Sequence, residues 1–101
     1  MRDIVREQLL AELLALKPEF ERQAVVRVAL FGSRARNDNR PDSDVDLMID
    51  VDETRKFSLL DLVGVGHLVE DHIGLPASVV IRRDMSPGFE RRVMRDEVLI
   101  F

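Results

Sequence analysis

The sequence predicts an α/β domain whose sheet is covered by helices on one face and open on the other. The first observation is the order of its segments, which reads helix, strand, short helix, strand, helix, strand, helix. The second is the alternation along residues 46–51, where Leu47, Ile49 and Val51 share one apolar face. The opposite face carries Asp44, Asp46, Met48, Asp50 and Asp52. A face this acidic cannot be buried without partners, so we expect it to be open and to form the site.

Three longer segments have the spacing or the end signals of helices. Apolar residues recur at helical intervals in residues 3–16, and Pro18 is expected to end that helix. Residues 19–23 are then either a short polar link or one more helical turn. Residues 57–73 form the second long helix, in which Gly64 and Gly66 each cost about 1 kcal/mol and could introduce a kink. Gly74 suits the end of that helix, and Ser86-Pro87 suits the start of another that runs to about residue 95.

The strands are predicted from short apolar runs between turn-forming residues. They cover residues 25–31, 46–51 and 77–81. Residues 37–42 are rich in turn formers and should be an exposed loop. Residues 98–101 are apolar and are either a last strand or a strap on the core.

Length and composition limit the function classes. The 101 residues form one domain, and the absence of cysteine excludes disulfides, thiolate metal sites and a cysteine nucleophile. The formal net charge of −4 and the small number of aromatic residues argue against binding of nucleic acid. No apolar run is long enough to cross a membrane and the first residues do not resemble a signal peptide, so we expect a cytoplasmic protein.

The end of the first strand has the features of a phosphate site. Gly32-Ser33 breaks the strand and can expose backbone N–H groups, and residues 34–36 then begin a helical turn. Asp44 and Asp46 project to one face with Cα atoms roughly 6–7 Å apart, because a strand rises about 3.3 Å per residue. Paired carboxylates beside phosphates favour Mg²⁺. The sequence therefore predicts a nucleoside triphosphate site with a bound metal.

These residues resemble a known signature. Gly32-Ser33, Arg34-Ala35-Arg36 and Ser43-Asp44-x-Asp46-Leu47 are similar to the Gly-Ser … Asp-x-Asp pattern of the polymerase-beta nucleotidyltransferase superfamily. The short chain looks most like the minimal nucleotidyltransferases, many of which are antitoxins of HEPN-domain toxins. The resemblance implies a two-layer fold with a small mixed sheet. It also implies transfer of AMP from ATP to a hydroxyl group, plausibly on a HEPN-type partner protein.

The resemblance also assigns roles to residues. Asp44 and Asp46 would be the catalytic carboxylates and would bridge two Mg²⁺ ions. Gly32 and Ser33 would hold the β- and γ-phosphates of ATP, and Arg34 or Arg36 would add positive charge at the pyrophosphate.

One position departs from the family pattern. A third carboxylate is expected on the later strand, where this chain has Ser78, which is neutral and a poor Mg²⁺ ligand. Asp50, Glu70, Asp71 and Asp84 are the acids that could substitute for it. Two alternatives to transfer onto a protein stay open: a catalytically degenerate antitoxin that acts by binding its partner, and transfer to a small molecule such as an aminoglycoside. The sequence identifies neither the nucleobase nor the acceptor, and it leaves an oligomer possible.

Overall fold

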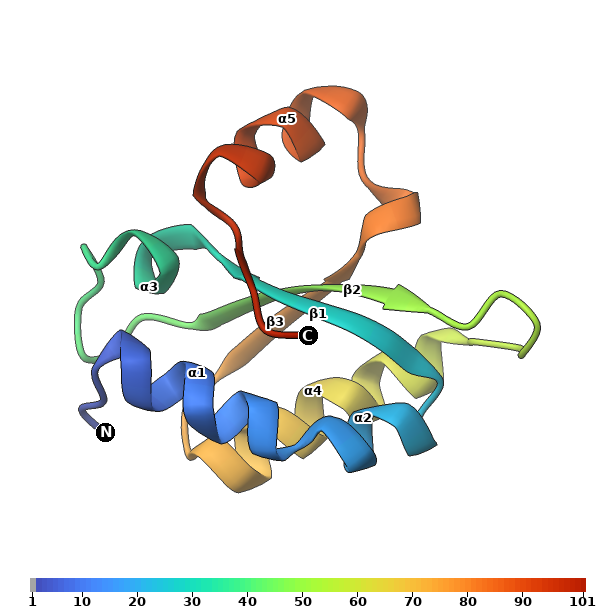
Figure 1. The fold of residues 1–101 in the computed structure, drawn as a ribbon, viewed down its shortest axis with the longest axis horizontal. Helices are drawn as coiled ribbons and strands as arrows, with labels where there is room; N and C mark the ends of the chain where they lie inside the picture. Colours follow the sequence, from blue (N-terminus) through green and yellow to red (C-terminus); the bar gives the residue numbers. More distant parts are fainter. Residues whose placement is uncertain (1) are drawn as a thin grey trace.

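A four-stranded mixed sheet lies at the centre of residues 2–101, which are the residues that this computed structural model describes (Figure 1). Its strands are β1 (Val25–Phe31), β2 (Val45–Val51), β3 (Ala77–Ile81) and β4 (Val98–Leu99). They lie in the order β3-β2-β1-β4. β1 is antiparallel to both β2 and β4, whereas β2 and β3 are parallel. The predicted strands and the small mixed sheet are confirmed.

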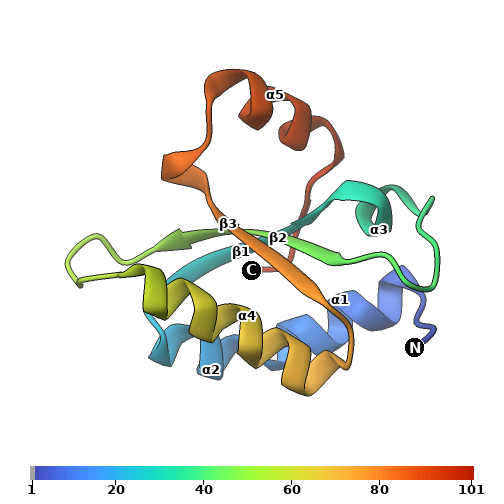
Figure 2. The same cartoon turned by 180° about the vertical axis from the view of Figure 1, so that it is seen from behind.

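Three helices cover one face of this sheet: α1 (Arg6–Ala15), α2 (Lys17–Arg22) and α4 (Leu59–Ile73) (Figures 1 and 2). Leu47, Ile49 and Val51 of β2 are buried on this side, as their alternation predicts. The core that they form with the helices includes Leu9, Leu13, Phe20, Val65 and Val69. None of the helices in the described residues is long and apolar enough to span a bilayer.

The ends of the helices were predicted in part. Gly74 ends α4 with φ 77°, as predicted. Ser58, which was not predicted as a cap, accepts a hydrogen bond from the Asp61 N–H in a capping box. The two glycines inside α4 do not interrupt it. The first helix ends just before Pro18, as predicted. Of the two possibilities for the residues after it, the structure shows the further helical turn rather than the link: Pro18 lies in the first turn of α2, where no hydrogen bond from its nitrogen is needed.

The fold class is confirmed, but helices do not lie on one face alone. α5 (Pro87–Asp96) stands over the second face (Figures 1 and 2). Its Val93 joins Ala29 and Met48 in a small second core, with Phe89 at the edge. The middle of this face is apolar, so it is covered. The open, polar part lies at the end where β1 leads into α3 (Gly32–Arg36) and β2 begins.

The C-terminal residues form a last strand, which was one of the two possibilities that the sequence left open for residues 98–101. β4 pairs with β1 through Leu30 and Val98, and the last two residues continue along β1. The Val28 N–H donates to the Phe101 carbonyl at 3.0 Å, and the Ile100 N–H donates to the Val28 carbonyl at 2.9 Å. On the opposite edge, β3 leads through a 3-10 turn (Arg82–Asp84) to the Ser86 N-cap of α5.

Candidate active site

The site is built around a contact between Gly32 and Asp46. The β1–β2 register places Asp46 opposite Phe31, so its side chain reaches the first residue of α3. Gly32 has φ 75°, a conformation that residues with a side chain rarely adopt. A Cβ atom built at Gly32 would overlap the Asp46 carboxylate. Glycine is therefore required here for two reasons, and the carboxylate lies directly against the start of the helix.

Asp44 and Asp46 form an unequal pair of carboxylates. Asp44 immediately precedes β2 and is exposed, whereas Asp46 lies within β2 and is partly buried. Burial raises the pKa of the Asp46 carboxyl above its usual value, and the charge of Asp44 raises it further. Arg36 and Arg34 lower this pKa by smaller amounts. The site therefore has an excess of negative charge that a cation would relieve.

The two carboxylates fit one hard divalent cation. Mg²⁺ binds through one or two protein carboxylates and completes its shell with water and substrate phosphates. Among residues 2–101, no cluster of three or more His, Cys, Asp or Glu side chains is arranged to hold an ion. Asp44 and Asp46 are thus the two carboxylates of this site that could hold a metal.

Ser78 is the residue that the sequence resemblance aligned with a third carboxylate. In the parallel β2–β3 ladder it is the partner of Asp46, and it is exposed. Its side chain therefore lies beside Asp46 on the same face of the sheet. The register thus gives the sheet face of Ser78, and its correspondence to a third carboxylate stays a prediction.

The other candidate acids lie elsewhere. The Glu70 carboxylate accepts a hydrogen bond from the Ala77 N–H at 3.1 Å, from the helix-covered side of the sheet. Asp50 is four residues further along β2 and pairs with Arg82 at 3.6 Å. Asp71 lies on the exposed surface of α4, and Asp84 lies in the turn after β3. None of the four is the strand partner of Asp46, a place that Ser78 takes.

Arg34, one of the two arginines that could add charge at a phosphate, is buried. Only 2% of its surface is accessible. Its Nε and Nη2 atoms donate to the Ser43 carbonyl at 3.0 and 2.9 Å, and Nη2 also donates to the Pro41 carbonyl at 3.1 Å. The short α3 helix turns this side chain inward, towards the loop that leads to Asp44.

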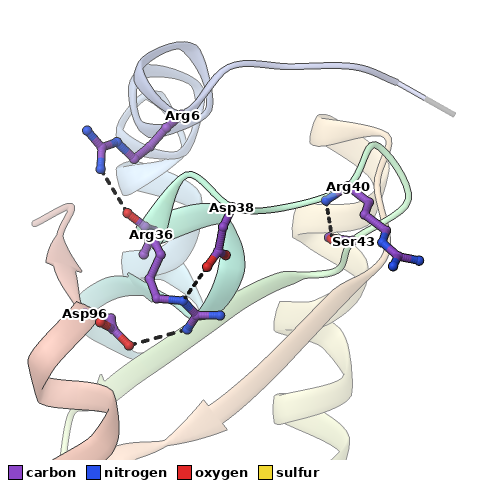
Figure 3. Close-up of polar contacts among 7 residues, drawn as sticks. Arg6, Arg36, Asp38, Arg40, Ser43 and Asp96 are labelled. Atoms are coloured by element: carbon purple, nitrogen blue, oxygen red, sulfur yellow. Dashed lines mark hydrogen bonds and ion pairs between the residues drawn. The ribbon is translucent and has the colours of Figure 1, made fainter.

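Arg36 and Ser33 remain accessible at the mouth of the site. The Arg36 guanidinium lies between Asp38, at 3.1 Å, and Asp96 of α5, at 3.4 Å (Figure 3). Ser33 is the second residue of α3 and is partly exposed, and its carbonyl accepts a hydrogen bond from the Asp38 N–H at 3.0 Å. A phosphate at Ser33 would have the Arg36 charge nearby, although two carboxylates already share that charge.

A cleft of about 290 Å³ opens beside Gly32, between α3 and α5. The rings of Phe31 and Phe89 meet edge to face, with centroids 6.1 Å apart, and the Arg92 guanidinium lies over Phe89. Sequence reasoning did not assign these residues to the site. The Ser86-Pro87 signal locates the start of α5 in the chain but does not determine the face of the sheet on which α5 packs.

Comparison with known proteins is consistent with this geometry. A family model described as a nucleotidyltransferase domain matches residues 7–100. The protein adenylyltransferase MntA of Thermococcus cleftensis is 31% identical over 101 residues, which are 99% of this chain and 100% of that protein. The solved structure of a candidate minimal nucleotidyltransferase has a TM-score of 0.81 and 32% identity, and the match covers 97% of this chain and 98% of the other.

A more distant likeness extends the fold comparison. The complex of tri-AMPylated Shewanella oneidensis HEPN toxin with MNT antitoxin contains a chain that matches with a TM-score of 0.69 and 11% identity. This match covers 96% of the present chain and 72% of the other, and at this identity it shows a shared fold alone.

Proposed function

The chain belongs to the nucleotidyltransferase domain family, and on this premise we propose that it transfers AMP from ATP to a hydroxyl group on a partner protein. The observation that carries the proposal is the contact of the Asp46 carboxylate with Gly32. This contact joins the two halves of the predicted site. A triphosphate at Gly32 and Ser33 would have its α-phosphate beside Asp44 and Asp46.

Mg²⁺ is the metal that this pair of carboxylates fits, and Asp44 and Asp46 would hold it. When bound, it would neutralise phosphate charge and stabilise the leaving oxygen. In the proposed reaction, the acceptor hydroxyl loses its proton to solvent, and its oxygen forms a bond to the α-phosphorus. The bond from that phosphorus to the bridging oxygen breaks, and pyrophosphate leaves with the electron pair of this bond.

The remaining roles fall to the chain's own groups. Backbone N–H groups and the hydroxyl at Gly32-Ser33 would bind the β- and γ-phosphates. Arg36 would contribute charge to pyrophosphate by exchanging one of its two carboxylate partners for phosphate. Because Arg34 is buried, it is not assigned to phosphate.

A protein acceptor is supported by the name of the Thermococcus relative, a protein adenylyltransferase of the same length. The resemblance of the Gly-Ser … Asp-x-Asp residues to minimal nucleotidyltransferases suggests that the partner is a HEPN-type toxin. The fold shared with the Shewanella antitoxin is compatible with that partner. We expect the reaction to take place in the cytoplasm.

A second function is favoured by one observation, the serine beside Asp46. Without a third carboxylate, a metal next to the acceptor hydroxyl has one protein ligand fewer. The alternative is therefore a degenerate nucleotidyltransferase that binds and neutralises its partner without modifying it. In that case, loss of Asp44 and Asp46 would leave the neutralisation intact.

The test is transfer of label from ATP labelled at the α-phosphate, with Mg²⁺ and the protein encoded by the neighbouring gene. Wild type, Asp46→Asn and Ser78→Asp are compared, with Asp50→Asn as the matched control. Asp50 lies on the same strand and the same face, but it pairs with Arg82. We expect wild type and Asp50→Asn to label the partner, and Asp46→Asn to lose the label.

Each other outcome has a distinct meaning. Label from Ser78→Asp alone would support the degenerate antitoxin, with an intact fold and phosphate site. Equal transfer by Asp46→Asn and wild type would refute the proposed enzyme. No label from any variant, together with stable co-purification of the two proteins, would leave the binding function as the better account.

A further inference from the structure

Arg34 is the only charged residue that is buried among residues 2–101. Removing a guanidinium from water costs several kcal/mol unless its donors are satisfied. The Arg34 guanidinium donates three hydrogen bonds, all to backbone carbonyl groups, and these offset the cost of burial. No carboxylate lies within ion-pair distance of Arg34 in the described residues. The charge is thus held in place by the loop itself.

The carbonyl groups that Arg34 binds belong to the residues just before Asp44. The carbonyl groups of Pro41 and Ser43 both accept hydrogen bonds from the Nε and Nη2 edge of the guanidinium. Arg34 thus links two points of the loop that ends at Asp44. The same loop is closed on its other side by Arg40. The Arg40 N–H donates to Ser43 Oγ at 2.9 Å, and the Ser43 N–H donates to the Arg40 carbonyl at 3.1 Å (Figure 3).

The strand fixes the next residue. The Val45 N–H donates to the Pro76 carbonyl at 2.8 Å, which joins the start of β2 to the residue before β3. The residues on both sides of Asp44 are therefore held by hydrogen bonds. The Ser43 carbonyl accepts from Arg34, and the Val45 N–H donates to the Pro76 carbonyl. The direction of the exposed Asp44 side chain depends on both.

We infer that Arg34 is a positioning residue that holds Asp44 in the geometry needed to share a metal with Asp46. Arg34 belongs to α3, whose first residues form the phosphate cradle, so the same short helix aligns the cradle with the carboxylate pair. Arginine suits this task because its planar guanidinium presents several donors in a fixed arrangement, whereas the ammonium of lysine is a point charge. The inference rests on the proposed function, in which Asp44 and Asp46 hold Mg²⁺.

Arg34→Lys and Arg34→Met test this inference, with Arg55→Met as the matched control. Arg55 also donates to two backbone carbonyl groups, those of Glu21 and Arg22, but it lies away from the site. The first measurement is the Mg²⁺ concentration that gives half-maximal ATP binding in calorimetry, at a temperature at which circular dichroism shows each variant to be folded. The second is hydrogen exchange at the Ser43 and Val45 amides of the protein without ligand.

Loss of a group hydrogen-bonded directly to a metal ligand weakens metal binding by about 10–100-fold. Arg34 binds the backbone next to Asp44 and not its carboxylate, so this range is an upper bound. We expect Arg34→Met to raise the half-saturating Mg²⁺ concentration by a measurable factor within that bound, Arg34→Lys to raise it by a smaller factor, and Arg55→Met to leave it unchanged. A residue that only stabilises the fold would lower the melting temperature without changing this concentration. Exchange at Ser43 and Val45 should be faster in both Arg34 variants.

An unchanged Mg²⁺ dependence in folded Arg34→Lys and Arg34→Met would overturn the inference. If Arg34→Met does not fold, Arg34→Lys decides, because it keeps the charge and most of the volume. If wild type itself does not bind Mg²⁺ and ATP, the proposed function fails and the metal-sharing part of the inference fails with it, whereas hydrogen exchange still tests whether Arg34 orders the loop before Asp44. Wild-type exchange rates at Ser43 and Val45 in Arg34→Lys would refute it.

Discussion

Gly32→Ala is the sharpest perturbation of the site because its effect can be divided into two parts. The first part is backbone strain. Gly32 has φ 75°, in the left-handed region, and adopting this region costs a residue with a Cβ atom about 1–2 kcal/mol. The second part is contact: the new methyl group would overlap the Asp46 carboxylate. Moving Asp46 away from its preferred rotamer costs a further ~0.5–1.5 kcal/mol.

Gly74→Ala is the matched control for the first part. Gly74 has φ 77°, and the nearest atom to a Cβ there is Arg2 Cδ at 3.9 Å. Because of backbone strain alone, Gly74→Ala should lower the free energy of unfolding by about 1–2 kcal/mol. Gly32→Ala should lower the free energy of unfolding by about 1.5–3.5 kcal/mol, the sum of the strain and contact parts. Of the two variants, only Gly32→Ala should impair binding of Mg²⁺ and ATP, because only it displaces Asp46.

Urea denaturation measures the free energy of unfolding of both variants, and calorimetry measures their binding of ATP with Mg²⁺. A double-mutant cycle isolates the contact. In an Asp46→Ala background, Gly32→Ala should cost no more than Gly74→Ala, which gives a coupling energy of ~0.5–1.5 kcal/mol. The reasoning is refuted if Gly32→Ala costs the same with and without the Asp46 carboxylate and binds ATP normally.

Three further outcomes are expected. Burial and the charge of Asp44 raise the pKa of the Asp46 carboxyl. The folded state therefore binds the carboxyl proton more tightly than the unfolded chain does, and wild type loses stability as the pH rises through the folded-state pKa of Asp46. Asp46→Asn should therefore melt at a higher temperature than wild type at pH 7, with a smaller advantage at pH 4; equal melting at both pH values would contradict this. Gly66→Ala should stabilise the protein by about 0.5–1 kcal/mol in thermal melts, because nothing lies within 4 Å of the new methyl group on a helix; a loss would contradict this. Ser58→Ala removes the acceptor for the Asp61 N–H and should cost about 0.5–2 kcal/mol in urea denaturation, and an unchanged midpoint would show that the cap is dispensable.

The local parts of the site could be predicted from the sequence because chain continuity places them together. A strand that ends at Gly32-Ser33 must turn there, and Asp46 follows Asp44 at an interval of two whatever the rest of the chain does. The alternation of β3 likewise predicts which face Ser78 occupies. These inferences use the period of a single element and need no knowledge of its neighbours.

The roles of the two arginines could not be separated in the same way. Arg34 and Arg36 are two apart on one short helix, and both have the charge that a phosphate needs. The burial of Arg34 follows from the path of the loop that returns over α3, and the exposure of Arg36 follows from its place at the edge facing α5. Both depend on segments that are distant in sequence.

By itself, the sequence determined the order of the elements between residues 25 and 95, the Gly-Ser turn, the carboxylate pair and the absence of an acid at residue 78, because these depend on neighbouring residues and on the repeat of each element. The tertiary structure alone decided that α5 covers Met48, that Gly32 lies against Asp46, and that Arg34 braces the loop before Asp44. The physical reason is that strand pairing and packing fix which distant segments meet, and a free energy shared among many weak contacts leaves no local pattern in the chain.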